Sequence, residues 1–192
     1  MQATQRLTTA SSEADIDRQI EQRKSRGAFG LFIFSMAVPY FVIINVRYLM
    51  VDTYVPSRLD QVTGGIETAL MLLSALAAIG ATRAARGLNA RAYRASVAAA
   101  LAGGLVATLM MLYEMWYHPM NPMSHFGETF LVSIGLAIVI NLASLFTLLA
   151  GRARSGRKGI TGETLTSFEL PAWFWVFATA GWIALYIELY FL

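Results

Sequence analysis

FGETFLVSIGLAIVINLASLFTLLA, at residues 126–150, is the longest apolar run of the chain and contains one charged residue, Glu128. A helix needs ~20 apolar residues to cross the ~30 Å hydrocarbon layer of a membrane, so this run is long enough to span it. Four more runs of similar character lie at residues 28–46, 65–81, 95–117 and 171–192. The connections between them are too short to hold a soluble domain. The sequence therefore predicts an all-α membrane protein, a bundle of five transmembrane helices.

The composition agrees with this fold class and excludes several functions. Hydrophobic residues make up 56% of the 192 residues and charged residues 14%, whereas soluble domains carry about 25% charged residues. Cysteine is absent, which excludes disulfides, thiolate metal sites and iron–sulfur clusters. The only histidines, His118 and His125, are too few for a haem–copper centre in this chain. We therefore expect no redox cofactor here.

The basic residues predict the orientation in the membrane. Counted by connection, 13 Lys and Arg residues fall on one side and only Arg47 and Arg58 on the other. Because basic residues accumulate in cytoplasmic loops, the N-terminus is predicted to be cytoplasmic and the C-terminus outside. We expect a multi-pass protein of the cell (inner or plasma) membrane. Its basic connections are expected to attract anionic lipid headgroups rather than nucleic acid.

Residues 1–27 form a polar cytoplasmic tail ahead of a membrane domain at residues 28–192. Ser12 and Asp15 resemble a capping box, which predicts a short surface helix from Ser12 to about Arg26. That helix would lie on the membrane boundary or dock to a neighbouring subunit. Within the first span, Pro39 is expected to kink the helix, and Pro171 is expected to lie in the first turn of the last one.

Polar side chains enter the apolar runs mainly near one boundary. Four carboxylates are predicted to lie toward the outer face, where they would reach water or the membrane interface: Glu67, Glu114, Glu128 and Glu188. None is at the centre of a run, which argues against a midplane proton relay within this chain. Two amides are expected to form hydrogen bonds between helices: Asn45 and Asn141.

One set of residues has the spacing of metal ligands. Glu114 and His118 are four residues apart, and His125 and Glu128 are three apart, so each pair can share a helix face. Two imidazoles and two carboxylates suit zinc or a similar divalent ion. The alternative is that these side chains simply mark a hydrated outer boundary.

The last run is rich in aromatic residues and carries a family resemblance. The stretch FELPAWFWVFATAGWIALYIELY, residues 168–190, resembles the final helix of subunit III of haem-copper oxidases, the cytochrome c and quinol oxidases. The matching positions are Glu169, Trp173, Phe174, Trp175, Phe177 and Trp182. Val176 and Thr179 stand where the family has His and Asp. Independently of the family, Trp173 is expected at headgroup level and Trp182 in a helix interface.

Weaker matches extend the resemblance to all five runs in order. Residues that match family positions in the second, third and fourth runs are Glu67, Thr68, Ser74, Tyr113, Glu114, Phe130 and Gly135. The polar centres of the family are missing, because Met36 replaces an acid and Ala137 and Ile140 replace two histidines. The chain therefore resembles a divergent five-helix member of the family.

The resemblance implies a non-catalytic accessory subunit of an oxidoreductase complex. Such a subunit would stabilise the catalytic subunit I, contact subunit II, bind phospholipid and assist proton uptake in aerobic electron transport, while haem and copper belong to the partner subunits. The same fold family includes an accessory protein of nitric oxide reductases, which is an alternative. A small transporter or metal-handling protein using Glu114, His118, His125 and Glu128 is a rival, and a transiently bound assembly factor is a third possibility.

Overall fold

The computed structural model describes the backbone of residues 2–52, 54–57, 59–117, 121–162 and 164–192, with side chains for all of these except residues 2–15, 17, 18 and 158. The elements are α1 (Gln2–Val51), α2 (Gln61–Arg86), α3 (Ala90–Tyr117), α4 (His125–Lys158) and α5 (Leu165–Tyr190). Each contains a stretch long and apolar enough to cross a membrane. The prediction of an all-helical chain with five such helices is confirmed.

Several helices begin or end outside the apolar runs that predicted them. The start of α2 is set by Asp60, whose side chain accepts hydrogen bonds from the backbone N–H groups of Val62 and Thr63 at 3.0 and 3.2 Å. The prediction for Pro171 is wrong, because α5 begins at Leu165 and Pro171 lies within the helix, beyond its first turn. Apolar runs mark the length that suits lipid, whereas a helix continues as long as its backbone hydrogen bonds do.

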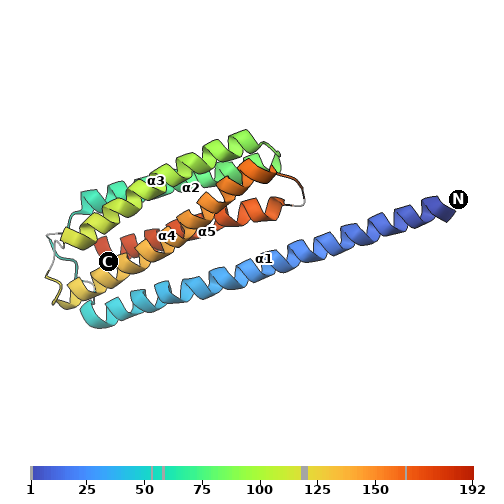
Figure 1. The fold of residues 1–192 in the computed structure, drawn as a ribbon. Coiled ribbons are helices and arrows are strands. Elements are labelled where there is room, and N and C mark those ends of the chain that lie inside the picture. Colours follow the sequence, from blue (N-terminus) through green and yellow to red (C-terminus); the bar gives the residue numbers. More distant parts are fainter. Residues whose placement is uncertain (1, 53, 58, 118–120, 163) are drawn as a thin grey trace.

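The N-terminal region differs most from the expectation. The predicted short helix from Ser12 to Arg26 is not separate: α1 is helical from Gln2 and continues through Pro39 to Val51. A capping box cannot start a helix at Ser12 when the preceding residues are already helical. In Figure 1 the N-terminal part of α1 projects well past the other helices, so the polar tail and the first apolar run form one rod.

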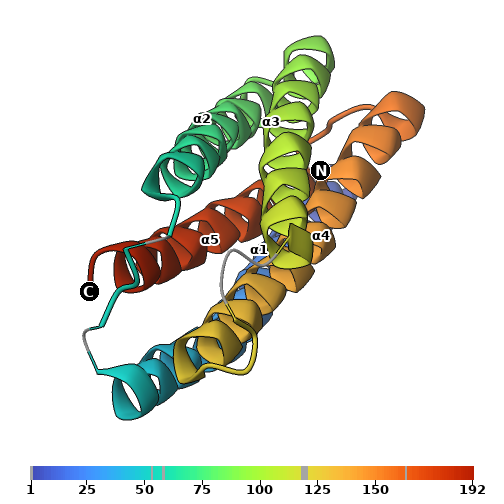
Figure 2. The ribbon, with the colours of Figure 1, turned by 90° about the vertical axis from the view of Figure 1, so that its left-hand side faces the viewer.

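Successive helices run in opposite directions (Figures 1 and 2). The chain termini therefore lie at opposite ends of the molecule. Helices α1 and α3 end, and α2 and α4 begin, at the end of the molecule that holds the C-terminus, here named the Glu67 end. Helices α2 and α4 end, and α3 and α5 begin, at the other, here named the Arg86 end. Helix α2 packs on α3 and α5, and α4 packs on α3 and α5, while among the described residues α1 contacts only α4 and α5.

Small residues allow the helices to approach closely. At Gly104 of α3, an added Cβ would lie within 2.9 Å of atoms of Trp175 and Leu145. At Gly64 of α2, an added Cβ would lie 2.7 Å from the ring of Tyr190. Close contact between backbones and large aromatic rings at such positions is typical of packed helices in membranes. It also explains how Trp175 becomes fully buried.

Candidate functional site

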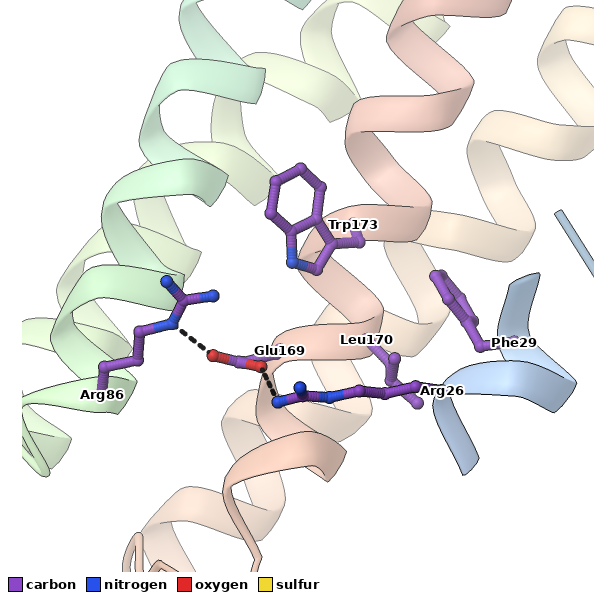
Figure 3. Close-up of a pocket in the computed structure, with 6 residues that line it drawn as sticks. All are labelled: Arg26, Phe29, Arg86, Glu169, Leu170 and Trp173. Carbon is purple, nitrogen blue, oxygen red and sulfur yellow. Dashed lines mark hydrogen bonds and ion pairs between the residues drawn. The ribbon is translucent and has the colours of Figure 1, made fainter. Parts of the chain in front are cut away.

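A pocket at the Arg86 end joins three helices through one carboxylate. Glu169 of α5 is 4% exposed and pairs with two arginines that approach it from α2 and α1 (Figure 3). Arg86 donates from Nε to Oε1 at 2.6 Å, and an Arg26 guanidinium nitrogen lies 3.5 Å from Oε2. Both arginine side chains remain 59% exposed, so each still presents donors to an incoming group.

The rest of this pocket is apolar. Phe29 of α1 and Leu170 and Trp173 of α5 complete the lining of a cavity of about 290 Å³. Two guanidinium groups against one carboxylate leave a net positive charge, and guanidinium groups bind phosphate and carboxylate oxygens well. The pocket therefore suits an anionic group attached to an apolar body.

A cluster of buried acids occupies the Glu67 end. Glu67 of α2 is fully buried, and among the described residues neither of its carboxyl oxygens has a hydrogen-bond partner. Glu114 of α3 is 6% exposed and accepts a hydrogen bond from the Tyr190 hydroxyl at 2.8 Å. Helices α2, α3 and α5 thus bring two carboxyls and a phenol together inside the bundle.

A buried ion pair lies at the same end. Arg47 of α1 is fully buried, and its Nε lies 3.6 Å from Oε1 of Glu188 on α5, which is 3% exposed. The guanidinium also donates to the backbone carbonyls of Asp52 and Tyr54 at 2.9 and 3.5 Å. It lies over the ring of Phe126 as well. The pair links the end of α1 and its following turn to α5.

The expectation that the four boundary carboxylates reach water is wrong for three of them. Glu67, Glu114 and Glu188 are buried, and only Glu128 is exposed. Position along an apolar run gives depth in a membrane, but it does not say which face of the helix points into the bundle. The burial of Glu67 and Glu114 depends on α5 covering them, which the sequence order does not reveal.

The two candidate amides behave differently. Asn141 of α4 donates across the bundle to the sulfur atoms of Met111 and Met71, at 3.5 and 3.9 Å, so the predicted contact between helices is confirmed. Asn45 instead donates to the carbonyl of Phe41 in its own helix at 2.6 Å, and the prediction of an interhelical bond is wrong within the described residues. Its side chain lies on the exposed surface of α1.

The candidate metal ligands are only partly described. His118 lies outside the described residues, and His125 and Glu128 are exposed at the start of α4. Glu114 faces the interior and is bonded to Tyr190. In the part of the chain that the structure describes, no three His, Cys, Asp or Glu side chains are grouped as a metal site would need. A metal site formed by Glu114, His118, His125 and Glu128 stays a prediction.

The positions that carry the family resemblance are spread over the length of the bundle. Trp182 is buried and donates from Nε1 to the Thr68 hydroxyl at 3.0 Å, which confirms its expected place in a helix interface. Trp175 is buried against Gly104, whereas Trp173 is 43% exposed beside Glu169. Tyr113 is 60% exposed on the outer surface of α3.

Sequence reasoning missed the pairing of Arg47 with Glu188 and that of Arg26 and Arg86 with Glu169. Each of these arginines follows or precedes an apolar run, so the sequence assigns it to a membrane side but to no partner. A usable signal was present: the predicted topology places each acid on the same side of the membrane as its arginine partner. Charges at equal depth in neighbouring helices can pair, and a buried charge requires a partner.

Comparison of the sequence with known protein families and with curated proteins finds no match to either.

Proposed function

We propose that this chain is a non-catalytic accessory subunit of a respiratory haem-copper oxidase, with a role like that of subunit III. It crosses the cell membrane five times, stabilises subunit I, contacts subunit II, binds phospholipid and assists proton uptake. Haem and copper belong to those partner subunits. Two observations support this proposal: the five apolar helices, and the pattern of Glu169, Trp173, Trp175 and Trp182 on α5.

The distribution of exposed charge supports a cytoplasmic N-terminus. Exposed arginines gather on α2, α3 and α4 at the Arg86 end: Arg83, Arg86, Arg91, Arg94, Arg152, Arg154 and Arg157. At the Glu67 end, Arg47 is buried in an ion pair. Under the positive-inside rule, the Arg86 end faces the cytoplasm and the C-terminus faces outside.

The observation that carries the proposal is an uncovered stripe on α1. Its members recur at intervals of three or four residues and therefore share one helix face: Leu31, Phe34, Val38, Phe41, Asn45 and Leu49. The four largest exposures among them lie between 73% and 86%. We name this surface the α1 stripe. Its single amide, Asn45, donates one hydrogen bond to the carbonyl of Phe41, and its side-chain oxygen favours another helix over lipid as the occupant, because lipid tails offer that oxygen no donor.

The pocket at the Arg86 end supports the lipid-binding part of the proposal. Arg26 and Arg86 would contact the phosphate of an anionic phospholipid, and Phe29, Leu170 and Trp173 would contact its glycerol and upper acyl region. In the proposed orientation this pocket lies at the cytoplasmic boundary, where anionic headgroups are found.

The proposal is tested by purifying the tagged full-length chain from its native membranes in a mild detergent and recording the haem spectrum of the product. We expect a polytopic haem protein to copurify with the chain in stoichiometric amount, and we expect the purified complex to consume oxygen. The double variant F34A/F41A should lose this partner. The control L76A/F146A removes two apolar side chains that are 63% and 71% exposed on α2 and α4, and it should retain the partner.

Other outcomes would overturn the proposal. A haem partner that reduces nitric oxide and not oxygen would assign the chain to the alternative complex. A chain that purifies without haem protein and moves divalent cations into liposomes would support the transporter. Retention of the partner by the stripe variant would exclude the α1 stripe as the docking surface.

A further inference from the structure

Glu67 is the least explained polar group of the interior. It lies in the second turn of α2, is fully buried, and among the described residues has no hydrogen-bond donor at either carboxyl oxygen. No ion pair joins it to a basic side chain in the described part of the chain. Leaving an ionised carboxylate in such a place is far more costly than leaving a neutral acid there.

A second carboxyl group increases this cost. Glu114 on α3 lies within electrostatic range of Glu67, and burial limits the screening of the two charges. Tyr190 stabilises only Glu114, because its hydroxyl donates to Oε2 of that residue. The two carboxyls are therefore not equivalent: one receives a donor and the other does not.

Tyr190 cannot readily turn from Glu114 to Glu67. Its ring lies against Gly64, where even an added Cβ would be only 2.7 Å away. Its backbone carbonyl accepts a hydrogen bond from Nε2 of Gln61 at 3.1 Å, which holds the end of α5 against the start of α2. The phenol is thus packed in a position that supplies one hydrogen bond to Glu114.

We propose that Glu67 is a buried proton-binding site: its carboxyl is a neutral acid, beside Glu114, which alone takes the Tyr190 hydrogen bond. A proton needs a single acceptor oxygen, whereas a metal ion needs four or more ligands in a defined geometry. The described residues here supply two carboxyls and a phenol. The site would exchange its proton with the aqueous phase beyond the Glu67 end.

The other titratable groups around the site do not supply the missing charge. Asp60, at the start of α2, and Tyr186, on α5, can add only negative charge. The side chains that α4 buries at the Glu67 end are apolar or neutral. The acid and the imidazole of α4 at that end, Glu128 and His125, are exposed. Glu188 is paired with Arg47.

Infrared spectroscopy of the purified full-length chain tests the proposal. A neutral carboxyl has a carbonyl stretch well separated from that of a carboxylate, and the band shifts in heavy water. We expect this band in the wild type at neutral pH, its loss in Glu67→Gln, and its retention in Glu114→Gln. Glu128→Gln, which changes an exposed acid, is the control and should leave the band unchanged.

A wild-type spectrum that Glu67→Gln leaves unaltered would overturn the proposal, and so would loss of the band in Glu114→Gln alone. Should Glu67→Gln fail to fold, Glu67→Asp keeps the acid and should show a shifted band. A second measurement compares the melting temperature of the wild type in sodium, potassium and choline salts at equal ionic strength. We expect no difference; stabilisation by one alkali ion would show that the site holds that cation instead.

Discussion

The ion pair of Arg47 and Glu188 shows how a single buried charge depends on its partner. Arg47 directly follows an apolar run, where a charged side chain could reach the membrane boundary, yet its side chain is fully buried. It contacts Glu188 and two backbone carbonyls, so it links α1 to α5 as well as neutralising a buried acid. Pairs of this kind do not add much stability, but removing one partner leaves an uncompensated charge.

Arg47→Met should therefore destabilise the fold by about 3–5 kcal/mol, because Glu188 then stays buried without a cation. The double variant R47M/E188M removes both charges and should recover a large part of that loss. The free energies can be measured by unfolding in mixed micelles with increasing SDS. Equal destabilisation of the single and double variants would show that the two charges are not coupled.

The pocket at the Arg86 end, which is proposed to bind phospholipid, gives a second test with single substitutions. If Arg26 and Arg86 contact a phosphate, replacing either by Ala should weaken binding of an anionic phospholipid by about 1 kcal/mol, roughly fivefold in affinity. Binding can be followed by native mass spectrometry with anionic and zwitterionic lipids. Arg83→Ala is the matched control, since Arg83 is exposed on the same helix but does not line the pocket. An equal effect of all three variants would indicate non-specific attraction.

At the scale of the helices, the N-terminus of α2 is capped by one side chain, that of Asp60. Asp60 accepts hydrogen bonds from Val62 and Thr63, and its bond with the Thr63 side chain is the main reason why the pKa of Asp60 lies below its usual value. A lowered pKa means that the folded state favours the ionised form. The capping contribution is thus complete above the usual pKa and is lost as the pH falls through the lowered one.

Amide hydrogen exchange at Val62 and Thr63 can follow this cap. In Asp60→Ala these amides should exchange faster than in the wild type at neutral pH, because their acceptor is gone. The difference should shrink as the pH is lowered and Asp60 becomes protonated. Asp60→Asn keeps an acceptor and should stay near the wild type at neutral pH. If the difference in exchange rate between Asp60→Ala and the wild type does not change with pH, a role for ionised Asp60 is excluded.

The five helices could be predicted from the sequence because each contains an apolar run, and such runs report directly on the length of a span. The helix bounds could not: α2 begins at Gln61 and α5 at Leu165, ahead of the apolar runs at residues 65–81 and 171–192, because the polar or mixed residues before those runs are also helical. Within the candidate site, Glu169 and Trp182 could be identified from the pattern of α5. The burial of Glu67 could not, because it depends on packing by Tyr190, which is distant in the sequence.

For the whole molecule, the proposed orientation can be tested without background labelling, because the chain has no cysteine. Single cysteines at Ser57→Cys and Leu192→Cys lie at the Glu67 end, and Ala153→Cys lies at the Arg86 end, all at exposed positions. A membrane-impermeant maleimide should label the first two in intact cells and the third only after permeabilisation. Labelling of all three from one compartment would contradict the five-span topology.

The contacts of α1 also bear on how the molecule is made. This helix is synthesised first, but α4 and α5, its packing partners, are synthesised last. At translation rates of about 5–20 residues per second, the ribosome needs on the order of 4 to 15 seconds to travel from the end of α1 to the start of α4. Throughout that interval the nascent first helix is without its native neighbours, so Tyr40 and Arg47 lack the contacts with α4 and α5 that bury them in the folded chain.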